Sequence, residues 1–165
     1  MRRVALVCGV AVVLSLMSSD SAIATAPTRE FAPLPEQIVL EGVCPDLTIV
    51  ADVLLNREYT ITFSDANGDP IRVLTQGTLK VRLTNPENGV SIVRNISGPG
   101  ETVFHADGSS TLTSRGAWFF FFTEGQLGAD SPPTSFISHG RIVLVTDPNG
   151  SQVLESGPAP SRISA

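Results

Sequence analysis

Apolar and polar residues alternate in parts of the chain after Leu47. The alternation is clearest at 59–63 and 79–84, where every second residue is apolar. A period of two turns one face of a β-strand toward a core and the other toward water. This pattern, or a short apolar run, predicts further strands at 47–55, 71–75, 90–97, 101–105, 110–115, 117–123, 135–138, 141–146 and 152–155. No stretch of this region has the periodicity of a helix, so an all-β domain is expected.

Two interleaved series of turn signals separate the predicted strands. The first is Asn67-Gly68, Asn88-Gly89, Asp107-Gly108 and Asn149-Gly150, whose residue types tolerate the positive φ of tight hairpin turns. The second series lies between them, at 56–57, 76–77, 98–100, 115–116 and 139–140. If the chain reverses at both series, neighbouring strands run antiparallel and form a meander.

A long meander has strand edges that must be protected from pairing with other chains. Closure into a barrel removes these edges. We therefore predict an antiparallel meander that closes into a barrel or a strongly curled sheet, similar to calycins and lipocalins. A sandwich of two sheets is the alternative.

The first 26 residues have the pattern of a signal peptide. Arg2 and Arg3 precede an uncharged apolar run at 4–16, and the small residues of Ala24-Thr25-Ala26 follow. This order is typical of a cleaved secretory signal. The apolar run is also shorter than the about 20 residues of a membrane-spanning helix. We predict cleavage after Ala26, a secreted product and no stable membrane insertion after cleavage.

Proline-rich segments flank the predicted β-domain. Because proline disrupts helices and central strands, residues 27–46 are predicted to form an extended leader. The β-domain is expected at 47–156, and a flexible tail at 157–165. The length of the chain suits one such domain.

Charge and cysteine content narrow the functional classes. The formal net charge is −5, and removal of Arg2, Arg3 and Asp20 with the signal lowers it by one. An acidic domain without a basic cluster is not expected to bind nucleic acid. Cys44 is the single cysteine after the signal and therefore has no partner for an internal disulfide. A buried, inert thiol is favoured over an intermolecular bridge or a reactive thiol.

Few segments suggest a metal-binding or catalytic site. Residues 65–69 carry oxygen side chains that suit calcium, but the spacing of an EF-hand is absent and a hairpin turn is favoured. His105 and His139 are the only histidines. His105 with Asp107 has the order of part of a Ser-His-Asp set, yet both histidines adjoin turns, and solvated turn residues are the favoured interpretation. No metal site, cofactor or catalytic residue is predicted.

Two features suggest binding instead. Residues 118–122 are apolar on both strand faces, which favours a central strand covered on both sides, although one face is also suited to a partner or a ligand. Arg94 shares a strand face with Ile92 and Ile96. A buried arginine needs a partner, so an internal carboxylate is favoured and an anionic ligand is the alternative.

Several short segments give the chain a family resemblance. They are 44–45, 77–81, 95–100, 116–121 and 140–144. With these segments the chain resembles a group of small secreted β-proteins of high-GC Gram-positive bacteria such as streptomycetes, for which no activity is established. The resemblance covers most of the chain after residue 26. It implies export and a β-domain, and it transfers no activity.

The main functional hypothesis is a secreted, non-enzymatic binding or interaction module. Its ligand is predicted to be a small apolar or anionic molecule in the barrel interior, and its partner otherwise an extracellular protein. The predicted ligand-binding residues are Arg94, Tyr59, Phe104 and Trp118. One alternative is a barrel-scaffold enzyme, a cyclase, isomerase or hydrolase that uses His105 or His139. Another is a structural protein of the cell envelope.

Overall fold

The computed structural model of the chain describes residues 26–44, 47–156 and 161–162. These residues form fourteen β-strands and no helix. Within this part of the chain there is accordingly no helix of the length and apolarity that crossing a membrane requires. The predicted signal peptide lies outside the described residues except for Ala26, which is exposed, and so does most of the predicted tail.

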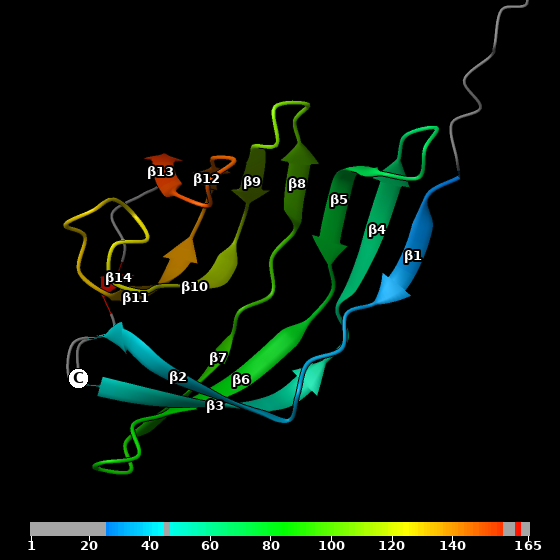
Figure 1. The fold of residues 1–165 in the computed structure, drawn as a ribbon. Coiled ribbons are helices and arrows are strands. Elements are labelled where there is room, and N and C mark those ends of the chain that lie inside the picture. The colour runs from blue at the N-terminus through cyan, green and yellow to red at the C-terminus, as the bar shows by residue number, and fades with distance from the viewer. Residues whose placement is uncertain (1–25, 45–46, 157–160, 163–165) are drawn as a thin grey trace, which may run out of the picture.

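All strand pairs are antiparallel, and they form three sheets (Figure 1). The seven-stranded sheet has the order β1 (Thr28–Phe31), β4 (Tyr59–Ser64), β5 (Pro70–Gln76), β8 (Gly100–Phe104), β9 (Ser110–Ser114), β12 (Ile142–Thr146) and β13 (Gln152–Ser156). The four-stranded sheet has the order β2 (Gln37–Cys44), β3 (Leu47–Asn56), β6 (Leu79–Thr84) and β7 (Ser91–Asn95). The three-stranded sheet has the order β10 (Ala117–Phe122), β11 (Thr134–His139) and β14 (Ser161–Arg162).

The residues expected to form a leader contribute two strands. β1 pairs with β4 at the edge of the seven-stranded sheet, and β2 pairs with β3 at the edge of the four-stranded sheet. The prolines at 33 and 35 lie between the two strands, where they remove no hydrogen bond from a sheet. At the other end of the chain, β14 pairs with β11.

The first series of turn signals marks hairpin turns. The amides of Gly68, Gly89, Gly108 and Gly150 each donate to a carbonyl three or four residues earlier in a turn. In each turn, a carboxylate or amide oxygen of an Asp or Asn side chain accepts hydrogen bonds from backbone amides of the same turn. Asp65 Oδ1, for example, accepts from the amides of Asn67 and Asp69, at 2.9 Å each. The oxygen side chains at 65–69 thus stabilise a hairpin, as favoured from the sequence.

The second series does not mark reversals, and the prediction that it does was wrong. At 57–58, 77–78, 96–99, 115–116 and 140–141 the chain passes from one sheet into another without turning back on itself. Neighbouring bends are hydrogen-bonded to each other through Ala32 N–Glu58 O, Arg57 N–Thr78 O, Ile96 N–Leu79 O, Arg115 N–Pro99 O and Gly140 N–Gly116 O. We call this row of linked bends the bend line. Each long strand of the meander is therefore one segment divided between two sheets.

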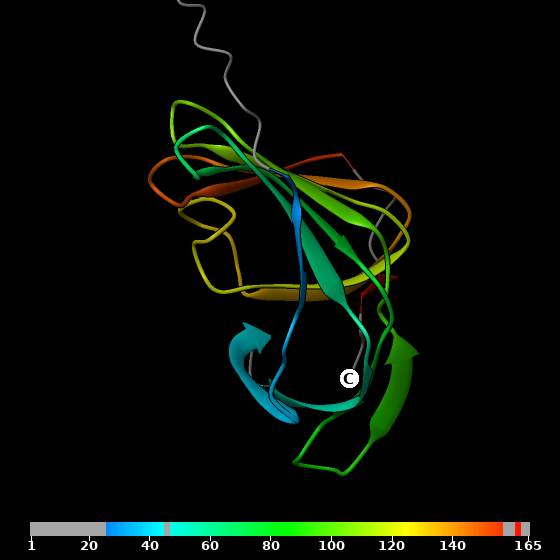
Figure 2. The ribbon, with the colours of Figure 1, turned by 90° about the vertical axis from the view of Figure 1, so that its right-hand side faces the viewer.

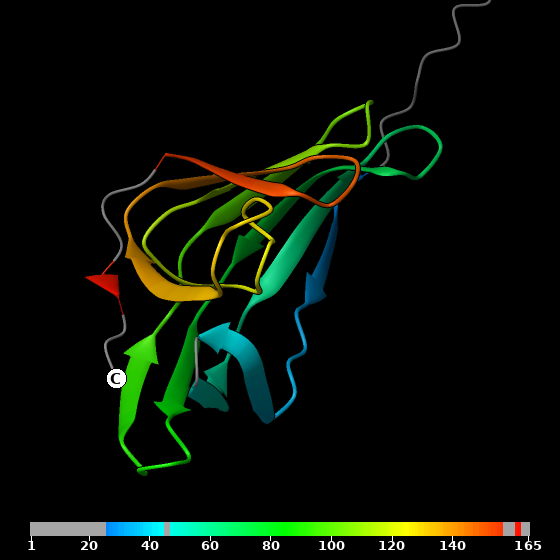
Figure 3. The ribbon, with the colours of Figure 1, turned by 60° about the vertical axis from the view of Figure 1, so that its left-hand side comes forward.

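The three-stranded sheet lies between the other two sheets (Figures 2 and 3). Its two faces enter different cores. The first core joins it to the four-stranded sheet and contains Leu40, Ile49, Ala51, Leu79, Val81, Leu83 and Ile137. The second core joins it to the seven-stranded sheet and contains Phe120, Phe122, Phe136, Ile142 and Leu144.

The all-β, antiparallel prediction is confirmed, whereas neither the predicted closure into a barrel nor the alternative of a strongly curled sheet is found among the described residues. The seven-stranded sheet begins at β1 and ends at β13, and no pairing among the described residues joins these two edges. The physical reason is the bend line. Strands that would have continued around a barrel leave the seven-stranded sheet at their bends and build separate layers.

Ser114 has the most deeply buried polar side chain of the described residues. Its side chain is 0% exposed, and its Oγ has no hydrogen-bond partner on the described part of the protein. A buried hydroxyl without a partner costs stability because it has lost its hydrogen bonds to water. We expect Ser114→Ala to raise the free energy of unfolding by about 1 kcal/mol, measured by urea denaturation.

Ser138→Ala is the matched control. Ser138 is also buried, but its Oγ accepts from Trp118 N at 3.2 Å and lies 3.3 Å from the Gly116 carbonyl. This substitution is expected to lower the free energy of unfolding. Equal losses in both variants would show that the Ser114 hydroxyl is satisfied after all.

Candidate functional site

The four residues predicted to bind a ligand do not meet at one place. Tyr59 begins β4, Trp118 lies on β10, Phe104 ends β8 and Arg94 lies on β7. Phe104 is 41% exposed at the start of the 105–109 turn. Phe104, Trp118 and Arg94 are not among the residues that line the hollow around Tyr59 described below.

Arg94 is exposed and does not point into a closed interior. It lies on β7, which pairs only with β6 among the described strands and is an edge of the four-stranded sheet. Its Nη1 donates to the carbonyl of Val93 at 3.0 Å. Because the edge strand leaves the guanidinium in water, Arg94 needs no internal carboxylate.

Trp118 has a structural role at the bend line. Its Nε1 donates to the Gly98 carbonyl at 3.0 Å, and its ring covers Gly98 and Gly100. The ring also stacks on Phe120, with centroids 6.1 Å apart. Its indole thus has its hydrogen bond and its packing partners within the fold.

The aromatic strand was predicted to be a central strand covered on both sides, but β10 is an edge strand and only one of its faces is fully covered. β10 pairs only with β11 among the described strands. Phe120 and Phe122 enter the second core, while Phe119 packs against the first core. Phe121 is 48% exposed. The second face of the strand is therefore only partly covered.

Beside Phe119 and Phe121 lies the apolar cavity, a space of about 190 Å³ between the four-stranded sheet and β10. Strands β2, β3 and β6 supply one wall, made of Ile38, Leu40, Ala51, Val53, Leu79, Val81 and Leu83. The remaining lining residues are Leu34, Ile96, Phe119 and Phe121. None of these side chains carries a charge or a polar group. Two of its lining residues, Leu34 and Phe121, are themselves partly exposed.

Strand alternation explains why this wall is apolar. In β6, Leu79, Val81 and Leu83 are buried, while Lys80 and Arg82 between them are exposed. The registers of β3 and β2 place Ala51 opposite Leu83 and Ile38 opposite Ala51. A small side chain at the centre of this row leaves space that the larger neighbours do not fill. Ala51 is thus the residue most directly responsible for the cavity.

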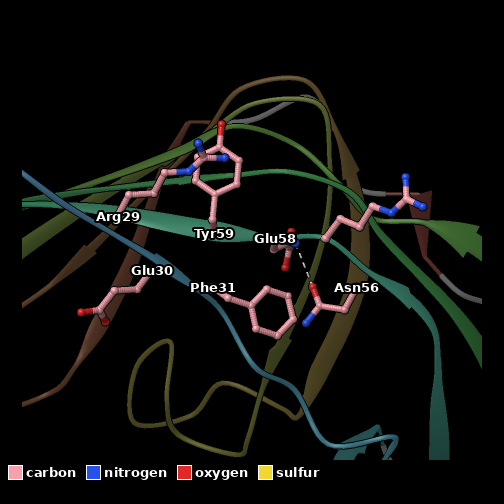
Figure 4. A pocket seen from close by; sticks show the side chains of 7 residues that line it. Arg29, Glu30, Phe31, Asn56, Glu58 and Tyr59 are labelled. Atoms are coloured by element: carbon pink, nitrogen blue, oxygen red, sulfur yellow. Dashed lines mark hydrogen bonds between the residues drawn. The ribbon is translucent and has the colours of Figure 1, made fainter.

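A second, open hollow surrounds Tyr59, where β1 meets the start of β4 (Figure 4). Residues 29–31 and 56–59 line this Tyr59 hollow, and its volume is about 430 Å³. The Arg29 guanidinium lies over the Tyr59 ring, 3.8 Å from its centroid. The Tyr59 hydroxyl donates to Gln76 Oε1 at 3.0 Å. These contacts fix the ring in the wall of the hollow.

Glu58 is the functional candidate that the sequence analysis missed. Its carboxylate has no hydrogen-bond or ion-pair partner among the described residues, and burial raises the pKa of the carboxyl above its ordinary value. Its backbone amide donates to Asn56 Oδ1 at 2.9 Å, while Asn56 Nδ2 donates to the Ala32 carbonyl at 2.7 Å. The bend is therefore held in place from both sides, and Glu58 with it. In the sequence, Asn56-Arg57 was interpreted only as a turn signal, and Glu58 was not singled out.

The histidines do not form a site. His105 Nε2 lies 2.9 Å from Thr111 Oγ1, and His139 ends β11 opposite Ala117. Both side chains are exposed, and neither lines the apolar cavity or the Tyr59 hollow. Asp107 serves its own turn, because its Oδ1 accepts from the Ser109 hydroxyl at 2.6 Å. This hydrogen bond from Ser109 lowers the pKa of the Asp107 carboxyl.

The described residues contain no group of three or more His, Cys, Asp or Glu side chains placed to hold a metal ion. The side chain of Cys44 lies outside the described residues. In comparisons with protein-family models, curated proteins and solved structures, no match to this chain was found.

Proposed function

We propose that the protein is an exported binding module that holds a small, uncharged apolar molecule in the apolar cavity. The observation that carries the proposal is the lining of the cavity, in which all eleven side chains are apolar. Apolar cavities of about 150 Å³ remain dry and bind molecules such as benzene. At about 190 Å³ this cavity has the volume for a ligand of that size.

The surroundings of the cavity favour an uncharged ligand over an anionic one. Arg94, the predicted anchor for an anion, is exposed and does not line the cavity. A charged group inside an apolar space without a partner would pay a large desolvation cost. The partly exposed side chains of Leu34 and Phe121 offer a path by which an apolar molecule enters.

The proposal also includes a location and an arrangement of sheets. Export rests on the signal-peptide pattern of residues 1–26. For the architecture, we favour a sandwich-like stacking of the three sheets over a closed barrel. The open edges at β1 and β13 support this choice.

Filling the cavity tests the proposal. Ala51 is buried and lines the cavity, so the added carbons of Ala51→Leu enter the space where the ligand would lie. We expect wild-type protein to bind benzene, with methyl NMR shifts confined to cavity residues such as Leu40 and Leu83. Ala51→Leu is expected to weaken benzene binding by more than about tenfold. It should also raise the free energy of unfolding by about 0.5–2 kcal/mol, as cavity filling commonly does.

Ala106→Leu is the matched control because Ala106 is exposed in the 105–109 turn. It should leave benzene binding unchanged. If the leucine at position 51 is too large to fit, Ala51→Val repeats the test with a smaller addition. Benzene binding that persists in a folded Ala51 variant would refute the proposal, and so would shifts located outside the cavity.

A further inference from the structure

The Tyr59 hollow has the properties of a second binding site, independent of the apolar cavity. The two spaces share no lining residue. At about 430 Å³, the hollow falls within the range of about 300–1,000 Å³ that is usual for small-molecule sites. Its walls combine aromatic rings with charged and amide groups, whereas the cavity is apolar throughout.

The aromatic surface of the hollow is unusually exposed. Phe31 lies opposite Tyr59 in the β1–β4 register and is 60% exposed. Phe31 is absent from both cores, so its ring contributes little to their packing. An exposed aromatic face held by strand pairing is suited to contact with the apolar face of a ligand.

The polar groups of the hollow define what else the ligand must offer. Figure 4 shows Glu58 in the part of the hollow between Tyr59 and Asn56, with Phe31 beside it. An ionised carboxylate only accepts hydrogen bonds, so a half-buried Glu58 without a partner favours a ligand with hydroxyl or amide donors. The Asn56 side chain is already used on both its oxygen and its nitrogen.

Charge balance excludes most ionic ligands. Two arginines, Arg29 and Arg57, and two glutamates, Glu30 and Glu58, line the hollow. An anion would lie close to the glutamates, and a cation would lie close to the arginines, so neither gains a net attraction. A neutral molecule with several hydroxyl groups can use both kinds of side chain, because carboxylates accept and guanidinium groups donate.

A sugar ring combines an apolar C–H face with a rim of hydroxyl groups. We infer that the Tyr59 hollow binds a neutral saccharide unit, with the Phe31 ring against the C–H face and Glu58 accepting hydrogen bonds from the hydroxyls. The open form of the hollow leaves room for the sugar to belong to a longer chain. This inference adds a ligand class to the protein and does not depend on the apolar cavity.

Saturation-transfer NMR with cellobiose, maltose and N,N′-diacetylchitobiose tests the inference on the purified full-length protein. At least one of these neutral disaccharides is expected to receive saturation. Phe31→Ala and Glu58→Gln are each expected to weaken binding of that disaccharide by about tenfold. Glu58→Gln keeps the size of the side chain and changes its charge and its hydrogen-bonding pattern.

Phe104→Ala is the matched control, because Phe104 is also an exposed aromatic residue but lies outside the hollow. It should leave saccharide binding unchanged, as should Ala51→Leu in the apolar cavity. Circular dichroism confirms that each variant is folded. The inference is overturned if none of the disaccharides binds, or if binding survives both Phe31→Ala and Glu58→Gln. Equal or tighter binding of galacturonate or glucosamine would overturn the restriction to neutral sugars.

Discussion

Replacing Phe120 by alanine is expected to lower the free energy of unfolding by about 3–5 kcal/mol. Phe120 is 6% exposed and stacks between Trp118, Phe122 and Phe136, with ring centroids 5.5–6.2 Å away. Removing its ring leaves a void at the centre of the second core, which the surrounding strands cannot collapse to fill. Urea unfolding followed by the fluorescence of Trp118, the only tryptophan, measures the loss.

Phe121→Ala is the control on the neighbouring position. Its side chain points to the opposite face of β10 and is 48% exposed. Because much of its ring is already in water, its removal is expected to cost about 1 kcal/mol or less. Similar losses for the two variants would contradict the assignment of the two strand faces to a closed core and a partly open surface.

Replacing Gly98 by alanine is expected to destabilise the fold by about 3 kcal/mol or more. A Cβ at this position would overlap the backbone carbonyl of Arg115 in the adjacent bend. It would also lie 2.7 Å from Nε1 of Trp118. The carbonyl belongs to a bend that is itself hydrogen-bonded to Pro99, so it cannot move without disrupting the bend line. Thermal and urea denaturation measure the effect.

Gly100→Ala serves to separate two causes of the stability loss at Gly98, namely the clash with the backbone carbonyl and the clash with the indole ring. At Gly100 the nearest atoms to a new Cβ all belong to the Trp118 ring. In a double-mutant cycle, Trp118→Ala should therefore relieve much of the cost of Gly100→Ala. The same second substitution should relieve Gly98→Ala much less, because the clash with the Arg115 carbonyl remains. Equal relief at both positions would argue against a backbone clash at Gly98.

Hairpin turns were predictable from the sequence because their chemistry is local. In one turn Asp65 accepts from the Asn67 amide and Gly68 takes a positive φ of 92°. In another, Asp107 accepts from the Ser109 amide and Gly108 takes a positive φ of 86°. Alternation likewise identified β4 and β6 almost residue for residue. In each case a few neighbouring residues determine the result.

The bends were predicted to be chain reversals because glycine with positive φ occurs both in hairpin turns and in bends. Gly77 and Gly116 also have positive φ, at 132° and 79°, yet the chain continues forward through them into another sheet. What separates a bend from a turn is the pairing of the flanking segments. β5 pairs with β4 and β8, whereas β6 pairs with β3 and β7. The two strands do not pair with each other. Such long-range pairing leaves no mark in a short stretch of sequence.

The candidate site was predictable only in part, for the same reason. Tyr59 was singled out from the sequence and does line a hollow, and the alternation of 79–84 gave the inward residues of the apolar wall. Glu58 was missed because its partial burial depends on β1, which the proline-rich composition of 27–46 concealed. Arg94 was expected in an interior, but its strand lies at a sheet edge.

The bend line makes the two cores inseparable. Strand segments that pass through it supply residues to the seven-stranded sheet on one side and to a smaller sheet on the other. If the strands of one sheet separate, the same chain segments continue into the strands of the neighbouring sheet, and the pairing there is weakened too. We therefore expect the described strands to unfold in one cooperative transition, although they form three sheets.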